Sequence, residues 1–352
     1  MTNWSQATGV SAKGWNECGR DSNGSRKTLK SFEAVSSQML LSWMHSRGDF
    51  PGNYFQPKCI INLNQHSQIS LATKDGVNRL HERQDNRESR EEHQAILKWL
   101  TPIDYASQQS DFISRRQAGT GQWFLKPAEF QAWLGTSKKT LFCPGIPGAG
   151  KTILTSIVVE ELNMRFQNDG SVGIAYLYYN FGKQHEQRLE DVLTSLLKQF
   201  VQEQPSVAQS VKTLYERHKD KRTRPSLDEI TRALYNATSH YSRAFILVDA
   251  LDECQANDGI RSRFLSDIFR LQAQCGVNLF ATSRFIPEIQ KEFEGSINLE
   301  IRASDEDVLR YVNGRMPLLL RSRISKYMDL QNTIRKKMLE AVDGMYNSPP
   351  SD

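Results

Sequence analysis

The first 80 residues show no sustained hydrophobic periodicity and are rich in Ser, Asn, Gln and Gly. Such a composition buries little apolar surface, so we expect residues 1–80 to form a low-order region. Within it, residues 32–44 (FEAVSSQMLLSWM) have the pattern of a short helix. From Asn78 to Leu100, charges of both signs are dense until an apolar stripe appears in the last turns. The pattern predicts an exposed linker helix that docks through this end and stops before Pro102. The stripe consists of Ile96, Leu97 and Leu100.

After Thr136, short apolar runs alternate with amphipathic segments, which is typical of a parallel sheet with helices on both faces. The predicted strands are residues 140–143, 172–179, 244–249, 278–283 and 297–301. The predicted helices are residues 153–162, 189–200, 226–237 and 263–274. We therefore predict an α/β three-layer sandwich with a parallel sheet at 136–303. A helical lead-in segment at 81–135 precedes it, and a partial helical subdomain at 304–352 follows it.

Composition and charge limit the class of protein, its expected partners and its cellular compartment. Hydrophobic residues make up 38% and charged residues 24% of the chain, which is ordinary for a globular protein. The net charge of +5 is too small to indicate nucleic acid or a membrane surface, and the basic segment 321–338 fits the solvated face of a helix. The five cysteines are scattered, and no signal peptide or long apolar run occurs. We expect a cytoplasmic protein with no nucleic-acid partner and no membrane partner.

The segment CPGIPGAGKT, residues 143–152, matches the pattern G-x-x-x-x-G-K-[ST]. In such a loop, backbone N–H groups surround phosphate oxygens and the following helix directs its positive end at them. Lys151 supplies charge to the β- and γ-phosphates, and the Thr152 hydroxyl can ligate Mg²⁺. The loop lies between an apolar strand and an amphipathic helix, so phosphate binding is favoured over a simple Gly/Pro turn. The candidate nucleotide-binding residues are Gly145, Ile146, Pro147, Gly148, Ala149, Gly150, Lys151 and Thr152.

Acidic residues and one arginine complete the candidate site. Asp249 ends the apolar run AFILVD, at the sheet edge where α/β proteins bind ligands, and a P-loop site needs one such Asp to hold Mg²⁺. Asp252 and Glu253 follow closely, so we expect three carboxylates near one metal, one of which activates water. Arg284 follows another strand, from which its guanidinium could reach a γ-phosphate. The alternatives without a function are an acidic turn for the carboxylates and a surface arginine for Arg284.

Four segments, CPGIPGAGKT, FILVDALDEC, NLFATSRFIPEI and LEIRASDEDV, occur in this order and resemble fungal NACHT-type signal-transduction NTPases of the STAND class. The N-terminal region of that family is grouped as nephrocystin-3-like, and the resemblance spans roughly residues 96–345. It implies a P-loop sheet in which the strand before Arg284 lies between the Walker A strand and the Walker B strand that ends at Asp249. It also implies binding of ATP or GTP with Mg²⁺ and slow hydrolysis. Members act as switches in non-self recognition, such as heterokaryon incompatibility, or in programmed cell death.

The same resemblance places AGTGQW, residues 118–123, beside the base and ribose, with Thr120 as a candidate binding residue. A turn whose Trp123 anchors into the core explains that segment equally well. Family members continue past Met345 with a winged helix and often repeats, so the resemblance predicts a member truncated after the NTPase core. Two functions stay open: a slow NTPase switch, and a non-hydrolysing nucleotide-binding scaffold or truncated regulator. The expected partners are a nucleoside triphosphate and, for signalling, a second copy or another signalling protein.

Overall fold

The computed structural model describes residues 57–182, 187–203, 208–255, 259–319, 332–338 and 340, and it divides into two compact units, Met1–Arg83 and Gln84–Asp352. Helix α4 (Pro57–Leu100) begins in the first unit. The short helix expected at 32–44 lies outside the described residues. Residues 57–80, which are part of the segment expected to have low order, are helical. Pro57 is compatible with a first helical turn, and no other proline interrupts the helix before its end.

A parallel sheet forms the centre of the second unit, with the strand order β2-β3-β4-β1-β5. Its strands are β1 (Thr140–Pro144), β2 (Val172–Tyr178), β3 (Arg243–Asp249), β4 (Asn278–Ser283) and β5 (Ile297–Asn298). The order confirms that β4 lies between β1 and β3. β5 is shorter than predicted because beyond Asn298 only single hydrogen bonds follow, from Leu299 N and Ile301 N to carbonyls of β1.

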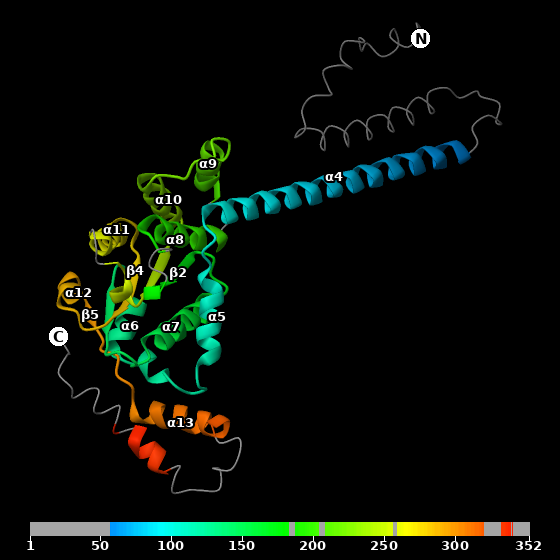
Figure 1. Cartoon of the computed structure of the whole chain (residues 1–352). Helices are drawn as coiled ribbons and strands as arrows, with labels where there is room; N and C mark the ends of the chain where they lie inside the picture. Colours follow the sequence, from blue (N-terminus) through cyan, green and yellow to red (C-terminus); the bar gives the residue numbers. More distant parts are fainter. Residues whose placement is uncertain are drawn as a thin grey trace, which may run out of the picture. The chain divides into compact units, whose positions relative to one another are not determined.

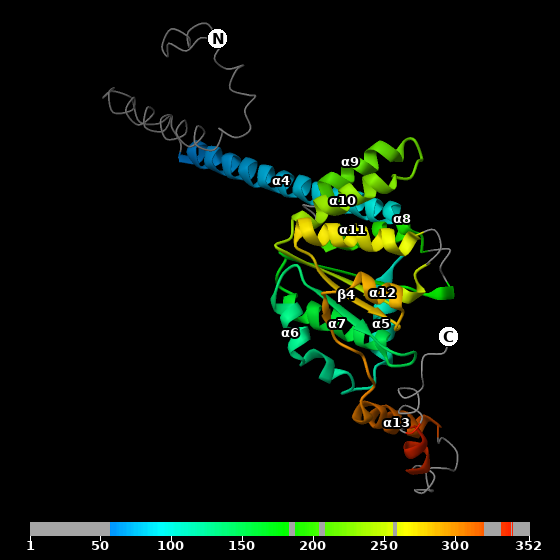
Figure 2. The ribbon, with the colours of Figure 1, turned by 90° about the vertical axis from the view of Figure 1, so that its left-hand side faces the viewer.

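Helices cover both faces of the sheet, as Figures 1 and 2 show. The helices that follow α4 along the chain are α5 (Tyr105–Arg115), α6 (Ala128–Gly135), α7 (Lys151–Phe166), α8 (Leu189–Glu203), α9 (Ala208–Lys219), α10 (Leu227–Ser239), α11 (Ile260–Cys275), α12 (Pro287–Glu292) and α13 (Asp305–Leu319). Buried residues of α6 and α7 pack on one face, and those of α8, α10 and α11 pack on the other. The three-layer α/β prediction is therefore confirmed. Helix α9 was not predicted.

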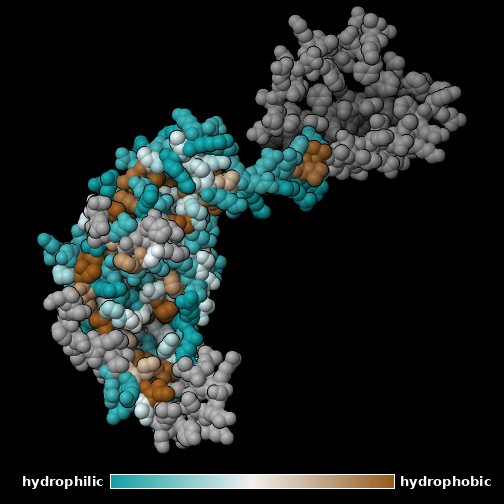
Figure 3. All heavy atoms as spheres, in the orientation of Figure 1, coloured by the Kyte–Doolittle hydropathy of each residue, from teal (hydrophilic) through white to brown (hydrophobic). Residues whose placement is uncertain are grey.

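The end of α4 docks as the apolar stripe predicted. Ile96, Leu97 and Leu100 are buried, whereas residues 84–91 are exposed. Figure 3 shows the surface of this helix as mostly hydrophilic. Arg224 donates from its guanidinium to the carbonyl oxygen of Leu100 over 3.2 Å, which satisfies a carbonyl that the helix end leaves without an intrahelical partner.

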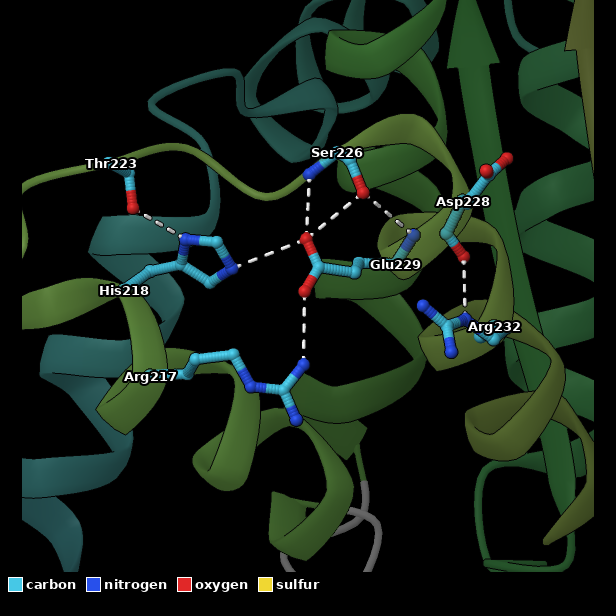
Figure 4. A network of polar contacts seen from close by, with 7 residues as sticks. All are labelled: Arg217, His218, Thr223, Ser226, Asp228, Glu229 and Arg232. Carbon is cyan, nitrogen blue, oxygen red and sulfur yellow. Dashed lines mark hydrogen bonds and ion pairs between the residues drawn. The ribbon is translucent and has the colours of Figure 1, made fainter.

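A polar network joins α9 to the start of α10 (Figure 4). Ser226 and Glu229 form a capping box at the N-terminus of α10. Arg217 approaches the Glu229 carboxylate over 3.0 Å and His218 approaches it over 3.3 Å, both from the last turn of α9. Hydrogen bonds from Ser226, followed by those from Arg217 and His218, lower the pKa of Glu229 to about 2. The two helices are thus joined through one ionised carboxylate.

Candidate functional site

The glycine loop connects the end of β1 to the start of α7, as its sequence predicted. Gly150 caps α7 with φ at 89°, a left-handed conformation that strains residues with a Cβ. Gly145 is required by close packing, because a Cβ there would lie 2.7 Å from the carbonyl oxygen of Ile301. The loop residues 148–150 line one side of a cavity. The first backbone N–H groups of α7 are therefore available at this end of the sheet.

Lys151 lies across the loop that it follows. Its Nζ donates to the carbonyl oxygens of Gly145 and Ile146, over 2.8 and 2.9 Å. Burial lowers the pKa of Lys151, and the nearby carboxylates of Asp252 and Asp249 partly oppose that change. The ammonium is therefore held inside the loop, where a phosphate group would meet it.

Asp249 is almost fully buried and accepts hydrogen bonds from three hydroxyl groups. Thr152 Oγ1 donates to Asp249 Oδ2 over 2.7 Å. Thr155 Oγ1 and Thr282 Oγ1 both donate to Asp249 Oδ1, each over 2.8 Å. Burial raises the pKa of Asp249, and the three hydroxyls and Lys151 act in the opposite direction. The structure thus brings the two predicted metal ligands, Thr152 and Asp249, into contact.

Thr155 and Thr282 were not predicted as part of the site. Thr155 follows Thr152 by three positions on α7, so the two share a helix face. Thr282 alternates with Ser283 on β4, and its side chain is on the sheet face that carries Asp249. The sequence feature that could have indicated both residues is a hydroxyl side chain within a mostly apolar helix or strand.

Asp252 and Glu253 do not join Asp249 in a metal cluster, which corrects the expected three-carboxylate site. Asp252 Oδ2 pairs with Arg284 Nε over 3.0 Å, and its Oδ1 accepts from Arg284 N over 3.1 Å. Glu253 Oε2 accepts from the backbone N–H of Phe181 over 2.9 Å. Across the described residues, no group of three His, Cys, Asp or Glu side chains could hold a metal ion. The reason is the left-handed turn at Ala250, after which the chain enters a short 3₁₀ helix (Leu251–Glu253).

The remaining oxygen donors still suit Mg²⁺. This ion is usually held by one or two carboxylates together with substrate phosphates and water, at near-octahedral geometry. The Thr152 hydroxyl and the Asp249 carboxylate are hard oxygen donors in direct contact at the end of the phosphate loop. One carboxylate and one hydroxyl fit a metal that shares its coordination with a nucleotide.

A cavity of about 330 Å³ opens between the glycine loop, the segment 115–123 and α13. Thr120, the candidate binding residue, is among the residues that line it. Gly121 N and Trp123 Nε1 both donate to Asp307 Oδ2, over 2.8 and 2.9 Å. Trp123 therefore has a polar partner on α13 in addition to its packing against the core. Asp307 was not predicted. Apolar walls of the cavity include Ile153, Leu154, Val308, Tyr311 and Val312.

The family model described as "Nephrocystin 3, N-terminal" matches residues 119–284. Among curated proteins, none matches this chain. Similar solved structures include the Aeropyrum pernix ORC1 protein in complex with DNA, at 18% identity and a TM-score of 0.36, covering 52% of this chain and 44% of that chain. Domain III of the Thermotoga maritima replication initiation protein DnaA has 15% identity and a TM-score of 0.36, covering 67% of this chain and 82% of that chain. This chain thus spans less than half of the ORC1 chain.

The prediction that excluded a nucleic-acid partner is wrong. The similar structures include ORC1 in complex with DNA and the Drosophila ORC bound to DNA, the latter at 18% identity and a TM-score of 0.31, covering 62% of this chain and 53% of that chain. A small net charge could not support the exclusion, because contacts to nucleic acid depend on where basic side chains cluster.

Within the described part of the chain, no helix has the length and apolar character needed to cross a bilayer.

The parallel sheet, the glycine loop before α7 and the family match agree on one conclusion: the second unit has a P-loop NTPase fold, and residues 119–284 are similar to the nephrocystin 3 N-terminal family.

Proposed function

We propose that this chain binds a Mg²⁺–nucleoside triphosphate, ATP or GTP, and acts as a nucleotide-dependent switch. The observation that carries the proposal is the contact between Thr152 Oγ1 and Asp249 Oδ2 at 2.7 Å, directly after the glycine loop. It joins a hydroxyl on α7, the helix after the loop, to a carboxylate at the end of β3, which β4 separates from β1 in the sheet. A hydroxyl and a carboxylate in contact are the ligands expected for Mg²⁺ bound to phosphate, whereas a simple turn does not require them.

The phosphates would lie on residues 145–152, where the N-terminus of α7 favours negative charge. Lys151 would exchange its carbonyl partners for phosphate oxygens. Mg²⁺, held by Thr152 and Asp249, would neutralise charge on the β- and γ-phosphates. The base and ribose would occupy the cavity beside Thr120, whose apolar walls suit a planar ring.

Slow hydrolysis is the part of the proposal that concerns catalysis. Asp252 is the candidate that positions or deprotonates the attacking water, with Glu253 as the second carboxylate. The Arg284 side chain is about half exposed, and among the described residues its guanidinium pairs with Asp252. Arg284 would therefore be able to leave Asp252 and move toward a γ-phosphate. That movement would release Asp252 for water.

A non-hydrolysing scaffold is the second candidate, and one observation favours it. Both candidate carboxylates are occupied by protein donors, Asp252 by Arg284 and Glu253 by Phe181 N. Single-turnover hydrolysis by wild-type protein and Asp252→Asn separates the two functions. A reduction of about 10²–10⁴-fold in the variant supports the NTPase, and equal rates support the scaffold.

The biological setting rests on the four motifs that resemble NACHT-type proteins. On that basis we place the switch in fungal non-self recognition or programmed cell death, in the cytoplasm, with a second copy or another signalling protein as partner. The NTPase core would then be residues 136–303.

Binding is tested with Lys151→Ala. The variant should bind Mg²⁺–ATP or Mg²⁺–GTP at least tenfold more weakly by calorimetry, about 1.4 kcal/mol, because no other charge replaces the ammonium inside the loop. Lys139→Ala is the matched control, since Lys139 is exposed and precedes β1 at the opposite end of that strand. Equal affinities of Lys151→Ala and wild type would refute nucleotide binding at this loop.

A further inference from the structure

Thr282 lies 33 residues after Asp249 in the sequence and contacts both Asp249 and the turn that follows it. Its hydroxyl donates to Asp249 Oδ1 over 2.8 Å. The same hydroxyl oxygen accepts the backbone N–H of Ala250 over 2.9 Å. Ala250 has φ at 54° and begins the turn that carries Asp252. One side chain on β4 is therefore bonded both to the metal carboxylate and to the turn after it.

The single proton of the Thr282 hydroxyl has a fixed direction. Ala250 N–H can only donate, so the hydroxyl oxygen accepts from it and the hydroxyl proton is directed at Asp249. Thr155 differs, because its one proton has two acceptors within reach, Asp249 Oδ1 at 2.8 Å and the carbonyl oxygen of Lys151 at 3.0 Å. Thr282 is thus the better defined donor to Oδ1.

The two carboxylate oxygens of Asp249 consequently have separate partners. Oδ1 accepts from Thr282 and Thr155, whereas Oδ2 accepts from Thr152, the predicted metal ligand. A carboxylate held through one oxygen keeps the other in a constant orientation, and such supporting hydrogen bonds tune the affinity of a metal site.

We propose that Thr282 is a positioning residue that holds Asp249 Oδ1, presents Oδ2 to the metal, and fixes the Asp252 turn relative to it. The inference rests on the proposed nucleotide function. Ser283, the next residue on β4, offers a matched comparison. Ser283 is as buried as Thr282, and its hydroxyl has no hydrogen-bond partner among the described residues. Its contact with the glycine loop is made by the backbone oxygen, which accepts from Gly145 N.

The test measures how much Mg²⁺ improves binding of fluorescent, non-hydrolysable ATP and GTP analogues, relative to binding in EDTA. Thr282→Val removes the hydroxyl at nearly constant volume and should reduce the Mg²⁺-dependent gain in affinity by about 10–100-fold. Affinity in EDTA should stay at the wild-type value, because the phosphate loop is untouched. Thr282→Ser should restore the gain, and Ser283→Ala should behave as wild type.

Two outcomes would overturn the inference: a wild-type Mg²⁺ gain in Thr282→Val, or an equal loss in Ser283→Ala. Should Thr282→Val fail to fold, Thr282→Cys replaces it, since the thiol is a poor donor and differs from Thr282→Ser by one atom. Loss in the cysteine variant alone supports the inference, and equal behaviour of the two variants refutes it. Wild-type protein that binds neither analogue would refute the proposed function itself, which keeps the two failures distinct.

Discussion

Arg284 and Asp252 bind each other, with Arg284 Nε 3.0 Å from Asp252 Oδ2 and the Arg284 backbone N–H donating to Oδ1. The Asp252 side chain is almost buried, whereas the Arg284 side chain is about half exposed. A γ-phosphate would therefore compete with Asp252 for the exposed partner. Under the proposed function, this arrangement would couple phosphate recognition to release of the candidate catalytic carboxylate.

Arg284→Ala should narrow the affinity gap between triphosphate and diphosphate, leaving diphosphate affinity almost unchanged. A charge-assisted hydrogen bond is worth about 1.5–3 kcal/mol, which corresponds to roughly 10–100-fold in triphosphate affinity. Calorimetric titration with both nucleotides measures the gap. Arg270→Ala, a substitution of a largely exposed arginine on α11, is the control. Unchanged triphosphate affinity in Arg284→Ala would show that Arg284 does not contact the γ-phosphate.

Asp307→Ala should weaken nucleotide binding and also lower the thermal stability of the free protein. The substitution leaves Gly121 N and Trp123 Nε1 without their acceptor; an unpaired donor costs about 1–3 kcal/mol when fully buried, and less in part-buried positions such as these. Nucleotide affinity should fall because the segment around Thr120 loses its attachment to α13. Thermal unfolding with and without nucleotide measures both effects.

Asp305→Ala is the matched control for Asp307→Ala. Both residues lie in the acidic first turn of α13, so both substitutions change the interaction with the helix dipole similarly. Asp305 is exposed. If the two variants were equally stable and bound nucleotide equally well, the hydrogen bonds that Asp307 accepts from Gly121 and Trp123 would have no role in nucleotide binding.

Glu229→Gln should destabilise the protein at neutral pH, and the difference from wild type should disappear in acid. The folded-state pKa of Glu229 is lowered from 4.5 to about 2, so the ionised carboxylate stabilises the folded state at pH values above 4.5. That contribution is lost as the pH falls from about 4.5 toward about 2. Urea unfolding of both proteins at stepwise lower pH measures it, with Asp228→Asn as the control on the same helix turn. A difference that stays constant down to the acid limit would contradict the network in Figure 4.

The sequence alone determined the elements that depend on local pattern. Alternating apolar runs and amphipathic segments specified the α/β class, and the glycine loop specified where phosphate would bind, because its backbone conformation is encoded within eight residues. Asp249 followed from its place at the end of a continuous apolar run. The docking turn of α4 followed from three apolar residues at helical spacing.

Only the tertiary structure decided which side chains meet. Trp123 and Asp307 are 184 residues apart, and Thr155 and Asp249 are 94 apart, so no local pattern relates them. The expected cluster of three carboxylates failed for a related reason: the left-handed backbone at Ala250 directs Asp252 to Arg284 and Glu253 to Phe181, away from Asp249. Residue type and spacing determine the chemistry that a side chain can perform. The order of strands in the sheet and the direction of each turn determine which other residues that side chain contacts. That is why the sequence identified the phosphate loop, and the fold identified Thr282 and Asp307.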